Sequence, residues 1–362
     1  MPIAVRKGAG VETSRARGRA KRSTTVRSVM VDAGGTILVT GARGFIGPYM
    51  VRQLLRTTQQ TIVAVDVKPV DPASDYPPQV VELALNLADE AAVKSLFIDH
   101  RIVRIFDLAS NAETGGMAED YRINLTMTSH ICAMVKTHDV ERLIFFSTCF
   151  VHRKEDELPA GDDDYAPVEA YGASKVESER HIRATLPADR WLVVRPTYVW
   201  GAGSNRFANG LLYRIAKGQM LLSSDRSIHR HYGHASTVCG QAAELADADP
   251  RETAGRVYYL SDPWMPLREF GNVAAHNIPG SKITHVPTRL IRALGVLGGL
   301  AGRSGIAFPI NPMQARELTS SFPIPLERTL RLTRTRVDLD AAMAETTAWA
   351  REATAGWTSK AT

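Results

Sequence analysis

The segment Thr36–Gly47, TILVTGARGFIG, carries the strongest fold signal in the chain. Its first four residues are β-branched or aliphatic and predict a short buried strand, and an apolar helical pattern follows over Tyr49–Leu55. Between them lie Gly41, Gly44 and Gly47, which an ordinary strand–loop–helix joint would not need at this spacing. Such a turn presents free backbone N–H groups and the positive end of a helix to a diphosphate. We therefore predict a dinucleotide-binding turn.

The charge of the chain is unevenly distributed. The 362 residues carry a net charge of +6, but residues 1–29 hold eight basic residues and one acid, hence +7, which leaves −1 for the remainder. The pI of 9.3 is therefore no argument for a nucleic-acid partner. Residues 1–29 lack apolar periodicity, and we expect a disordered extension. We interpret it as the product of an upstream start, since Met30 falls just before the first strand, with a transit peptide as the alternative.

The cysteines and apolar stretches bear on location. Three cysteines, Cys132, Cys149 and Cys239, lie in predicted helices or strands, and this odd number favours free thiols in a reducing compartment. No CxxC or clustered His/Cys spacing predicts a metal site. The most apolar stretch, Leu290–Ala301, is interrupted by Arg292 and is too short to span a bilayer. We expect a cytoplasmic protein without a membrane partner.

Strands and helices alternate through the first half of the chain. Strands are predicted at Thr36–Val39, Thr61–Val67, Val80–Leu87, Ile102–Ala109, Glu141–Ser147 and Trp191–Arg195, and the later helices at Asp89–Asp99, Met117–His138 and Ala170–Thr185. This alternation predicts an α/β fold with a Rossmann-type doubly wound parallel sheet. Beyond Thr197 the alternation fails. We expect a cofactor domain over 30–196 and a smaller C-terminal substrate-binding lobe over 197–362, with Tyr258–Leu260 returning to the sheet.

Further cofactor contacts are predicted at the strand ends. Asp66 ends the second strand, where a carboxylate can accept both hydroxyls of an adenosine ribose and so favours NAD. Arg43 in the glycine turn could instead pair with the 2′-phosphate of NADP. Asn86 either bonds the adenine edge or forms a turn. The predicted NAD-binding set is Gly41, Arg43, Gly44, Phe45, Ile46, Gly47, Asp66, Asn86, Leu87, Leu108, Ala109 and Lys175.

The catalytic candidate is Tyr171-Gly172-Ala173-Ser174-Lys175. On a helix, Tyr171 and Lys175 lie on one face. A phenol titrates near pH 10 in water, and a neighbouring ammonium lowers the pKa by favouring phenolate. Such a phenol can remove the proton of an alcohol during hydride transfer, or donate it to a carbonyl in reverse. A second hydroxyl that holds the substrate oxygen is expected at Thr148, after the fifth strand.

This constellation resembles the extended short-chain dehydrogenase/reductase family from about Thr36 to the C-terminal end. The motifs that carry the resemblance are Thr40–Gly47, Asp66, Ser147–Val151, Tyr171 with Lys175, Val194–Gly201 and Arg230–His234. The family includes nucleotide-sugar epimerases, dehydratases and reductases as well as dehydrogenases of sterol-like alcohols. Its members commonly dimerise through two helices, here Ala118–His138 and Ala170–Thr185, which implies a homodimer.

Departures from the family pattern narrow the chemistry. Sugar 4,6-dehydratases of the family place Asp-Glu after the active hydroxyl, where this chain has Cys149 and Phe150, so dehydration is disfavoured. Gly115-Gly116-Met117 resembles a loop of GDP-mannose 3,5-epimerases and GDP-fucose synthases, which carry an epimerising Cys at the position of Phe150. Unless the loop shifts by one residue, Cys149 is a small buried hydrophobe.

The substrate evidence is divided. Arg230 matches an Arg that contacts the diphosphate in nucleotide-sugar members, but Tyr198 replaces an Asn that often binds the same group; we expect both, with Thr148, to contact substrate. The tail from Tyr258 and the Leu290–Leu300 helix resemble the sterol-dehydrogenase branch. We predict an NAD-dependent 4-epimerase or 4-ketoreductase of a nucleotide sugar. The alternatives are an oxidoreductase of an apolar alcohol and, from another class, a non-catalytic dinucleotide sensor.

Overall fold

A computed structural model describes residues 34–353 except 114, 155, 306, 307 and 309. The extension predicted for residues 1–29 lies outside the described residues. Within the described part, no helix combines the length and the apolar character needed to cross a membrane.

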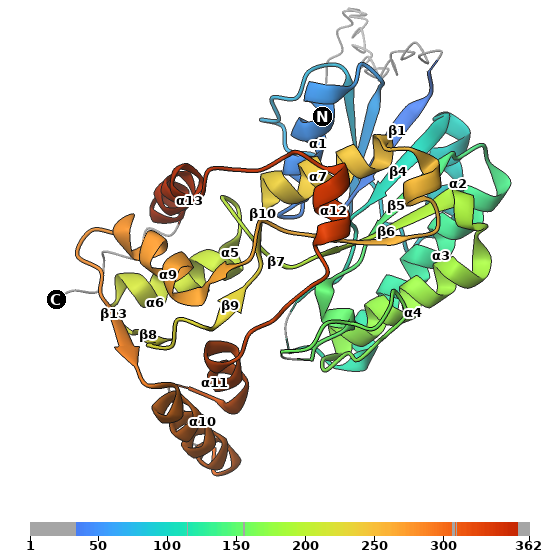
Figure 1. Cartoon of the computed structure of the whole chain (residues 1–362). Coiled ribbons are helices and arrows are strands. Elements are labelled where there is room, and N and C mark those ends of the chain that lie inside the picture. Colours follow the sequence, from blue (N-terminus) through green and yellow to red (C-terminus); the bar gives the residue numbers. More distant parts are fainter. Residues whose placement is uncertain (1–33, 114, 155, 306–307, 309, 354–362) are drawn as a thin grey trace, which may run out of the picture. The chain divides into compact units, whose positions relative to one another are not determined.

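A seven-stranded parallel sheet forms the centre of the described chain (Figure 1). Its order is β11-β6-β5-β4-β1-β2-β3, in which the sequence order reverses between β1 and β4. The strands are β1 (Thr36–Thr40), β2 (Ile62–Asp66), β3 (Val80–Ala84), β4 (Ile102–Asp107), β5 (Arg142–Phe146), β6 (Trp191–Pro196) and β11 (Val257–Leu260). Ligands of such sheets bind where the order reverses, outside the carboxyl ends of the strands. The predicted doubly wound sheet is confirmed.

Helices cover both faces of the sheet because successive strand residues point to opposite sides. On one face Ile37 and Val39 pack with α1 (Gly47–Thr57) and α7 (Ala235–Asp247). On the other face Leu38 packs with side chains from α2 (Glu90–Asp99), α3 (Arg122–Thr137) and α4 (Ala170–Thr185). The predicted helix at Met117–His138 is divided, because a 3₁₀ turn, η1 (Ala118–Tyr121), precedes α3.

In the described residues, three small two-stranded sheets accompany the central one. They pair β7 (Tyr198–Trp200) with β10 (Tyr232–His234), β8 (Met220–Ser223) with β13 (Ile283–Val286), and β9 (His229–Arg230) with β12 (Met265–Pro266). The intervening and later helical elements are α5 (Asn205–Phe207), η4 (Ala208–Leu212), α6 (Tyr213–Ala216), α8 (Pro250–Thr253), α9 (Leu267–His276), α10 (Thr288–Arg303), α11 (Pro312–Thr319), α12 (Glu327–Leu332) and α13 (Leu339–Ala353). As predicted, β11 returns from this region to the sheet.

Candidate active site

The glycine turn leaves β1 at the point where the strand order reverses. Gly41 has φ +62°, and a Cβ there would lie 2.9 Å from the Ala109 backbone nitrogen. A Cβ on Gly47 would lie 2.5 Å from the Ala42 carbonyl oxygen, so α1 packs against the turn only because this residue is glycine. The Thr40 hydroxyl donates to Asp107 and accepts from the Ala109 N–H at 3.0 Å, which ties the turn to the end of β4. The glycines thus let the turn pack tightly between β1, the end of β4 and α1, and this strand–turn–helix geometry fits a dinucleotide.

Asp66 and Arg43 lie together at the end of β2. The Asp66 carboxylate accepts the backbone N–H of Arg43 at 2.8 Å and that of Lys68 at 3.0 Å, so it holds the glycine turn in place. The Arg43 guanidinium donates to the Lys68 carbonyl and lies 3.5 Å from the Glu82 carboxylate. Arg43 and Lys68 line a large cavity of the described chain, and Asp66 is not part of its lining. The Asp66 carboxylate and the Arg43 guanidinium, which could each select between NAD and NADP, therefore both lie at the end of β2.

Of the other predicted cofactor residues in strand ends and loops, Leu108 lines the cavity, and the remaining three make contacts within the protein. The Ala109 N–H is bound by Thr40. Asn86 is exposed and its side chain accepts the Ala88 N–H at 3.0 Å, which is the turn-forming arrangement. Leu87 is buried in the core. Their predicted contacts with NAD stay predictions.

One cavity of about 2290 Å³ brings the catalytic candidates and the turn together. Its wall includes Thr148, Tyr171 and Lys175, and it also includes the turn residues Gly41, Arg43, Gly44, Phe45, Ile46 and Gly47. The start of α4 comes close to the loop after β5 because Gly172 has no side chain: a Cβ there would lie 2.6 Å from the Phe150 carbonyl oxygen. This approach brings the phenol of Tyr171 to the same cavity wall as the Thr148 hydroxyl.

Burial dominates the electrostatics of the Tyr–Lys pair. It raises the pKa of Tyr171 to about 12, against a hydrogen bond from Ser110 that lowers it. It also lowers the pKa of Lys175 to about 8, although Asp107 and Glu179 favour the ammonium. Lys175 Nζ donates to the Phe146 carbonyl at 2.9 Å. The pKa of Tyr171 is therefore raised, not lowered as predicted, because loss of water outweighs the opposing effects of Ser110 and Arg206; Lys175 is not one of the groups that shift it.

Thr148 lines the cavity, whereas its neighbour Cys149 does not. The Thr148 hydroxyl accepts the Phe150 N–H at 3.3 Å and lines the cavity. Cys149 is fully buried among apolar side chains, and burial raises the pKa of its thiol to about 12. The thiol is therefore protonated and away from the cavity, which agrees with the interpretation of Cys149 as a small hydrophobe.

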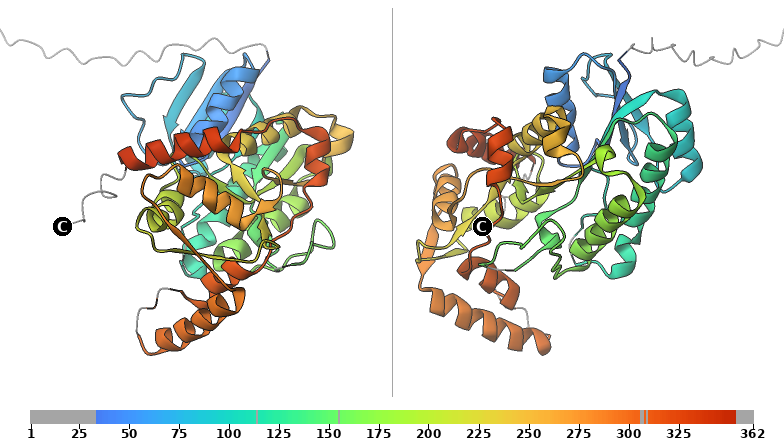
Figure 2. Two further views of the ribbon diagram at one scale, coloured as in Figure 1. Left: turned by 60° about the vertical axis from the view of Figure 1, so that its left-hand side comes forward. Right: turned by 45° about the vertical axis from the view of Figure 1, so that its right-hand side comes forward.

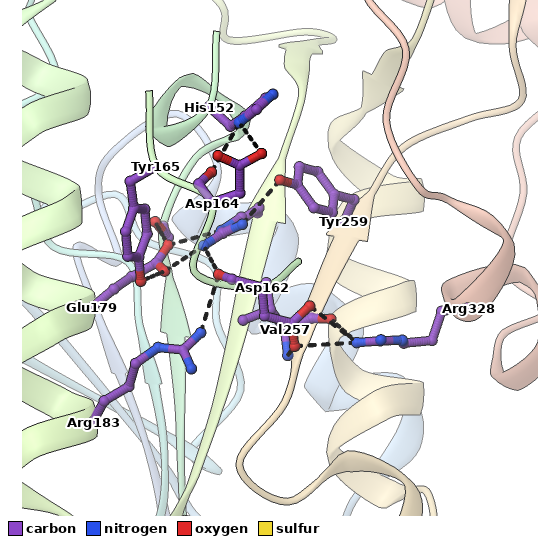
Figure 3. A network of polar contacts seen from close by, with 11 residues as sticks. His152, Asp162, Asp164, Tyr165, Glu179, Arg183, Val257, Tyr259 and Arg328 are labelled. Atoms are coloured by element: carbon purple, nitrogen blue, oxygen red, sulfur yellow. Dashed lines mark hydrogen bonds and ion pairs between the residues drawn. The ribbon is translucent and has the colours of Figure 1, made fainter. Parts of the chain in front are cut away.

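A buried polar network surrounds Glu179 of α4 (Figure 3). Glu179, one helical turn beyond Lys175, accepts the Ser147 hydroxyl at 2.5 Å and the Tyr165 hydroxyl at 2.9 Å. Arg195 of β6 bonds both oxygens of the same carboxylate at 3.0 and 2.7 Å, and both side chains are fully buried. The network joins α4 to the residue before Thr148. Sequence analysis missed Glu179, although its i+4 spacing from Lys175 places it on the same helix face.

The far end of the cavity combines arginines with apolar side chains. Arg230 donates to the Tyr198 hydroxyl at 3.2 Å and to the Ser320 carbonyl at 3.2 Å. Arg153 pairs with Glu169 at 2.8 Å and Glu317 at 2.6 Å. The wall also includes Arg206, Arg214, Leu221, Ile310, Met313 and Leu318. Arg230 and Tyr198 therefore meet on this wall, but each already contacts the other. The Arg153 cluster was not predicted, because its members are distant in sequence.

The three histidines near β9 and β10 make local contacts. His229 Nδ1 lies 2.9 Å from the Ser227 carbonyl and His231 Nδ1 lies 3.2 Å from the Asp262 carbonyl. His234 accepts the Ser236 N–H at 3.2 Å and caps α7. Each of the three rings is therefore engaged in a hydrogen bond with the backbone nearby.

Comparisons with known proteins identify the family of this chain and several relatives. The model of the NAD dependent epimerase/dehydratase family matches residues 37–258. The chain is 29% identical over 255 residues to a 2-alkyl-3-oxoalkanoate reductase of Stenotrophomonas maltophilia, which covers 65% of this chain and 73% of the reductase. It is 28% identical over 173 residues to the UDP-glucose 4-epimerase of Mus musculus, which covers 42% of this chain and 49% of the epimerase. This chain thus spans about half the length of that epimerase.

Solved structures share the fold. The UDP-glucose 4-epimerase of Thermus thermophilus, solved as a complex with NAD, has a TM-score of 0.62 and 21% identity, covering 88% of this chain and 99% of that one. The predicted family resemblance and the predicted fold are confirmed, and the family match confirms NAD as the cofactor.

Proposed function

Because the chain belongs to the NAD dependent epimerase/dehydratase family, we propose that it transfers hydride at a secondary alcohol of a nucleotide sugar, as a 4-epimerase or 4-ketoreductase. The observation that carries this proposal is that Tyr171, Lys175 and Thr148 line the same cavity as the glycine turn. The presence of both hydroxyls and the turn on one cavity wall supports the proposal.

Each catalytic side chain has a proposed role. NAD, when bound, would supply the nicotinamide that accepts hydride from the carbinol carbon of the substrate. Thr148 orients the substrate oxygen through its hydroxyl. Tyr171, protonated at neutral pH, would donate its proton to that oxygen when a ketone is reduced with hydride from the reduced cofactor; in the reverse direction its phenolate form would accept the alcohol proton. Lys175 stabilises the phenolate left after donation. The raised pKa of Tyr171 makes proton donation available over the physiological pH range.

The charge of the cavity wall supports a diphosphate-bearing substrate. Both carboxylates beside Arg153 are paired with it, whereas the bonds of Arg230 go to uncharged hydroxyl and carbonyl oxygens. Arg206 likewise donates to the Ala112 carbonyl at 2.8 Å. The arginines therefore exceed the carboxylates, and guanidinium groups suit bidentate contact with phosphate oxygens.

A second candidate is an oxidoreductase of an apolar oxo or hydroxy acid. Leu221, Ile310, Met313 and Leu318 form an apolar wall beyond Arg230, and such a wall suits alkyl chains while the arginine suits a carboxylate. The similarity to a 2-alkyl-3-oxoalkanoate reductase adds to this candidate.

Replacement of Tyr171 tests the proposed chemistry. Tyr171→Phe removes only the hydroxyl, and we expect turnover to fall by at least about a hundredfold, the usual contribution of a general acid–base group. NAD affinity, measured by calorimetry, should stay unchanged. The matched control is Tyr165→Phe, which removes a phenol hydroxyl bonded to the same helix away from the cavity. Wild-type turnover in Tyr171→Phe would remove Tyr171 from the mechanism.

A thermal-shift screen tests the substrate class. Nucleotide sugars and alkyl hydroxy acids are compared in the presence of NAD, because a ligand that binds only the folded state raises the melting temperature. Selective stabilisation by nucleotide sugars supports the first candidate. Selective stabilisation by hydroxy acids favours the second.

A further inference from the structure

The outward face of α10 is apolar and exposed. Leu290, Val296, Leu297 and Leu300 expose 46%, 64%, 52% and 54% of their surface. Leu290, Leu297 and Leu300 repeat at spacings of seven and three residues and so lie along one stripe of the helix. Scattered exposed leucines are ordinary, but a stripe of them on one helix marks an interaction surface.

The opposite face of α10 explains why the stripe points outward. Ile291 is fully buried, and Gly295 and Gly298 face Ala315 and the Ile310 carbonyl so closely that a Cβ on either would clash. The glycines let α11 pack against this side, and Figures 1 and 2 show the two helices side by side. The orientation of α10 is therefore set by its contact with α11, which leaves the leucines outside.

Basic residues border the leucine stripe. Arg289, Arg292 and Arg303 are exposed on α10, which contains no acidic residue. Residues 286–320 hold four arginines and one acid, Glu317, for a net charge of +3, whereas residues 30–362 together carry −1. Glu317 pairs with Arg153 on the cavity wall. A second copy of this chain would bring the same positive charge to the face, so the charge favours an anionic partner.

We propose that α10 binds in the plane of an anionic lipid surface. The leucines enter the boundary between headgroups and acyl chains, while the arginines contact lipid phosphates, as in interfacial amphipathic helices. This revises the expectation from sequence that no membrane is involved. Ile310 and Met313 line the cavity next to α10, so the lipid surface would lie beside the apolar end of the site; a lipid-linked substrate would follow only if the proposed function holds.

A fluorescent label at Leu297 tests the proposal in the full chain. Cys132, Cys149 and Cys239 are buried, so a Leu297→Cys variant directs an environment-sensitive nitrobenzoxadiazole label to α10. The control is Ile98→Cys on α2, where the native side chain is 79% exposed. We expect vesicles of phosphatidylglycerol to shift the emission at residue 297 to shorter wavelength and raise its intensity about twofold or more, and to leave residue 98 unchanged. Vesicles of phosphatidylcholine should have a much smaller effect.

A second measurement separates α10 from the basic residues 1–29, which can also attract anionic vesicles. Salt at about 0.5 M screens exposed charges, so vesicle co-sedimentation that persists there reports apolar insertion. The triple variant Leu290→Gln/Leu297→Gln/Leu300→Gln should lose about tenfold in partitioning. No shift at residue 297, an equal shift at residue 98, or an equal response to both lipids would overturn the proposal. So would a concentration-dependent shift without vesicles, which would assign the face to a second copy. Turnover of a soluble substrate by the triple variant reports on the proposed function separately.

Discussion

Replacement of Lys175 by Met should stabilise the protein while it impairs catalysis. Lys175 is 2% exposed, and burial lowers its pKa from 10.5 to about 8. At about 1.36 kcal/mol per pH unit, this drop corresponds to a cost of about 3 kcal/mol for keeping the buried ammonium at neutral pH. Lys175→Met removes the charge and retains most of the apolar volume. It also removes the hydrogen bond to the Phe146 carbonyl, which offsets about 1 kcal/mol.

The expected net gain in the free energy of unfolding is therefore about 2 kcal/mol at pH 7. Its pH dependence has a definite sign. Between pH 8 and pH 10.5 the unfolded chain holds a proton on Lys175 that the folded chain has lost, so wild-type stability rises with pH across this window. The gain of the variant is full below pH 8, falls by about 1.36 kcal/mol per pH unit above it, and turns into a loss of about 1 kcal/mol as the pH approaches 10.5, where only the lost hydrogen bond remains.

Urea unfolding of both proteins between pH 7 and pH 10 measures this difference. The matched control is Lys94→Met, because Lys94 is 55% exposed and pairs with Glu90 on the surface of α2. That variant should show little change in the same window. Destabilisation by Lys175→Met at every pH, or a difference from wild type that does not vary with pH, would refute the argument that burial of the ammonium is costly.

Three further replacements test other parts of the site. Asp66→Ala should lower the preference for NAD over NADP, measured as the ratio of kcat/KM for the two cofactors; an unchanged ratio, with a change in Arg43→Ala, would assign the selection to Arg43. Cys149→Ala should retain activity at a cost of about 1 kcal/mol in stability, since the thiol is buried and protonated; a hundredfold loss of turnover would restore it as a catalytic candidate. Gly47→Ala should lose NAD affinity and about 1–3 kcal/mol of stability, because its Cβ meets the Ala42 carbonyl; calorimetric NAD binding at the wild-type level would contradict the packing argument.

Elements with local sequence signals could be predicted from the chain alone. The strand and the three glycines of Thr36–Gly47, with the helix that follows, could be predicted because a turn that approaches a phosphate closely favours glycine. The alternation of strands and helices predicted the parallel sheet, since such crossovers have one hand and short connections. The spacing of Tyr171 and Lys175 placed both on one helix face, and the structure brings that face to the cavity.

Tertiary structure decided what depends on burial and on contacts between distant residues. The pKa of Tyr171 rises rather than falls, because the loss of water around the phenol is a property of the packed site. Arg153 pairs with Glu317, which is 164 residues away in the chain. Glu179 of α4 pairs with Arg195 of β6. Neither ion pair follows from a regular spacing in the sequence. Likewise the sequence alone did not show which face of α10 is exposed; the contact of Gly295 and Gly298 with Ala315 and the Ile310 carbonyl leaves the leucines outside. Sequence periodicity shows that a helix has two faces, but which face is covered depends on the neighbour that packs against it.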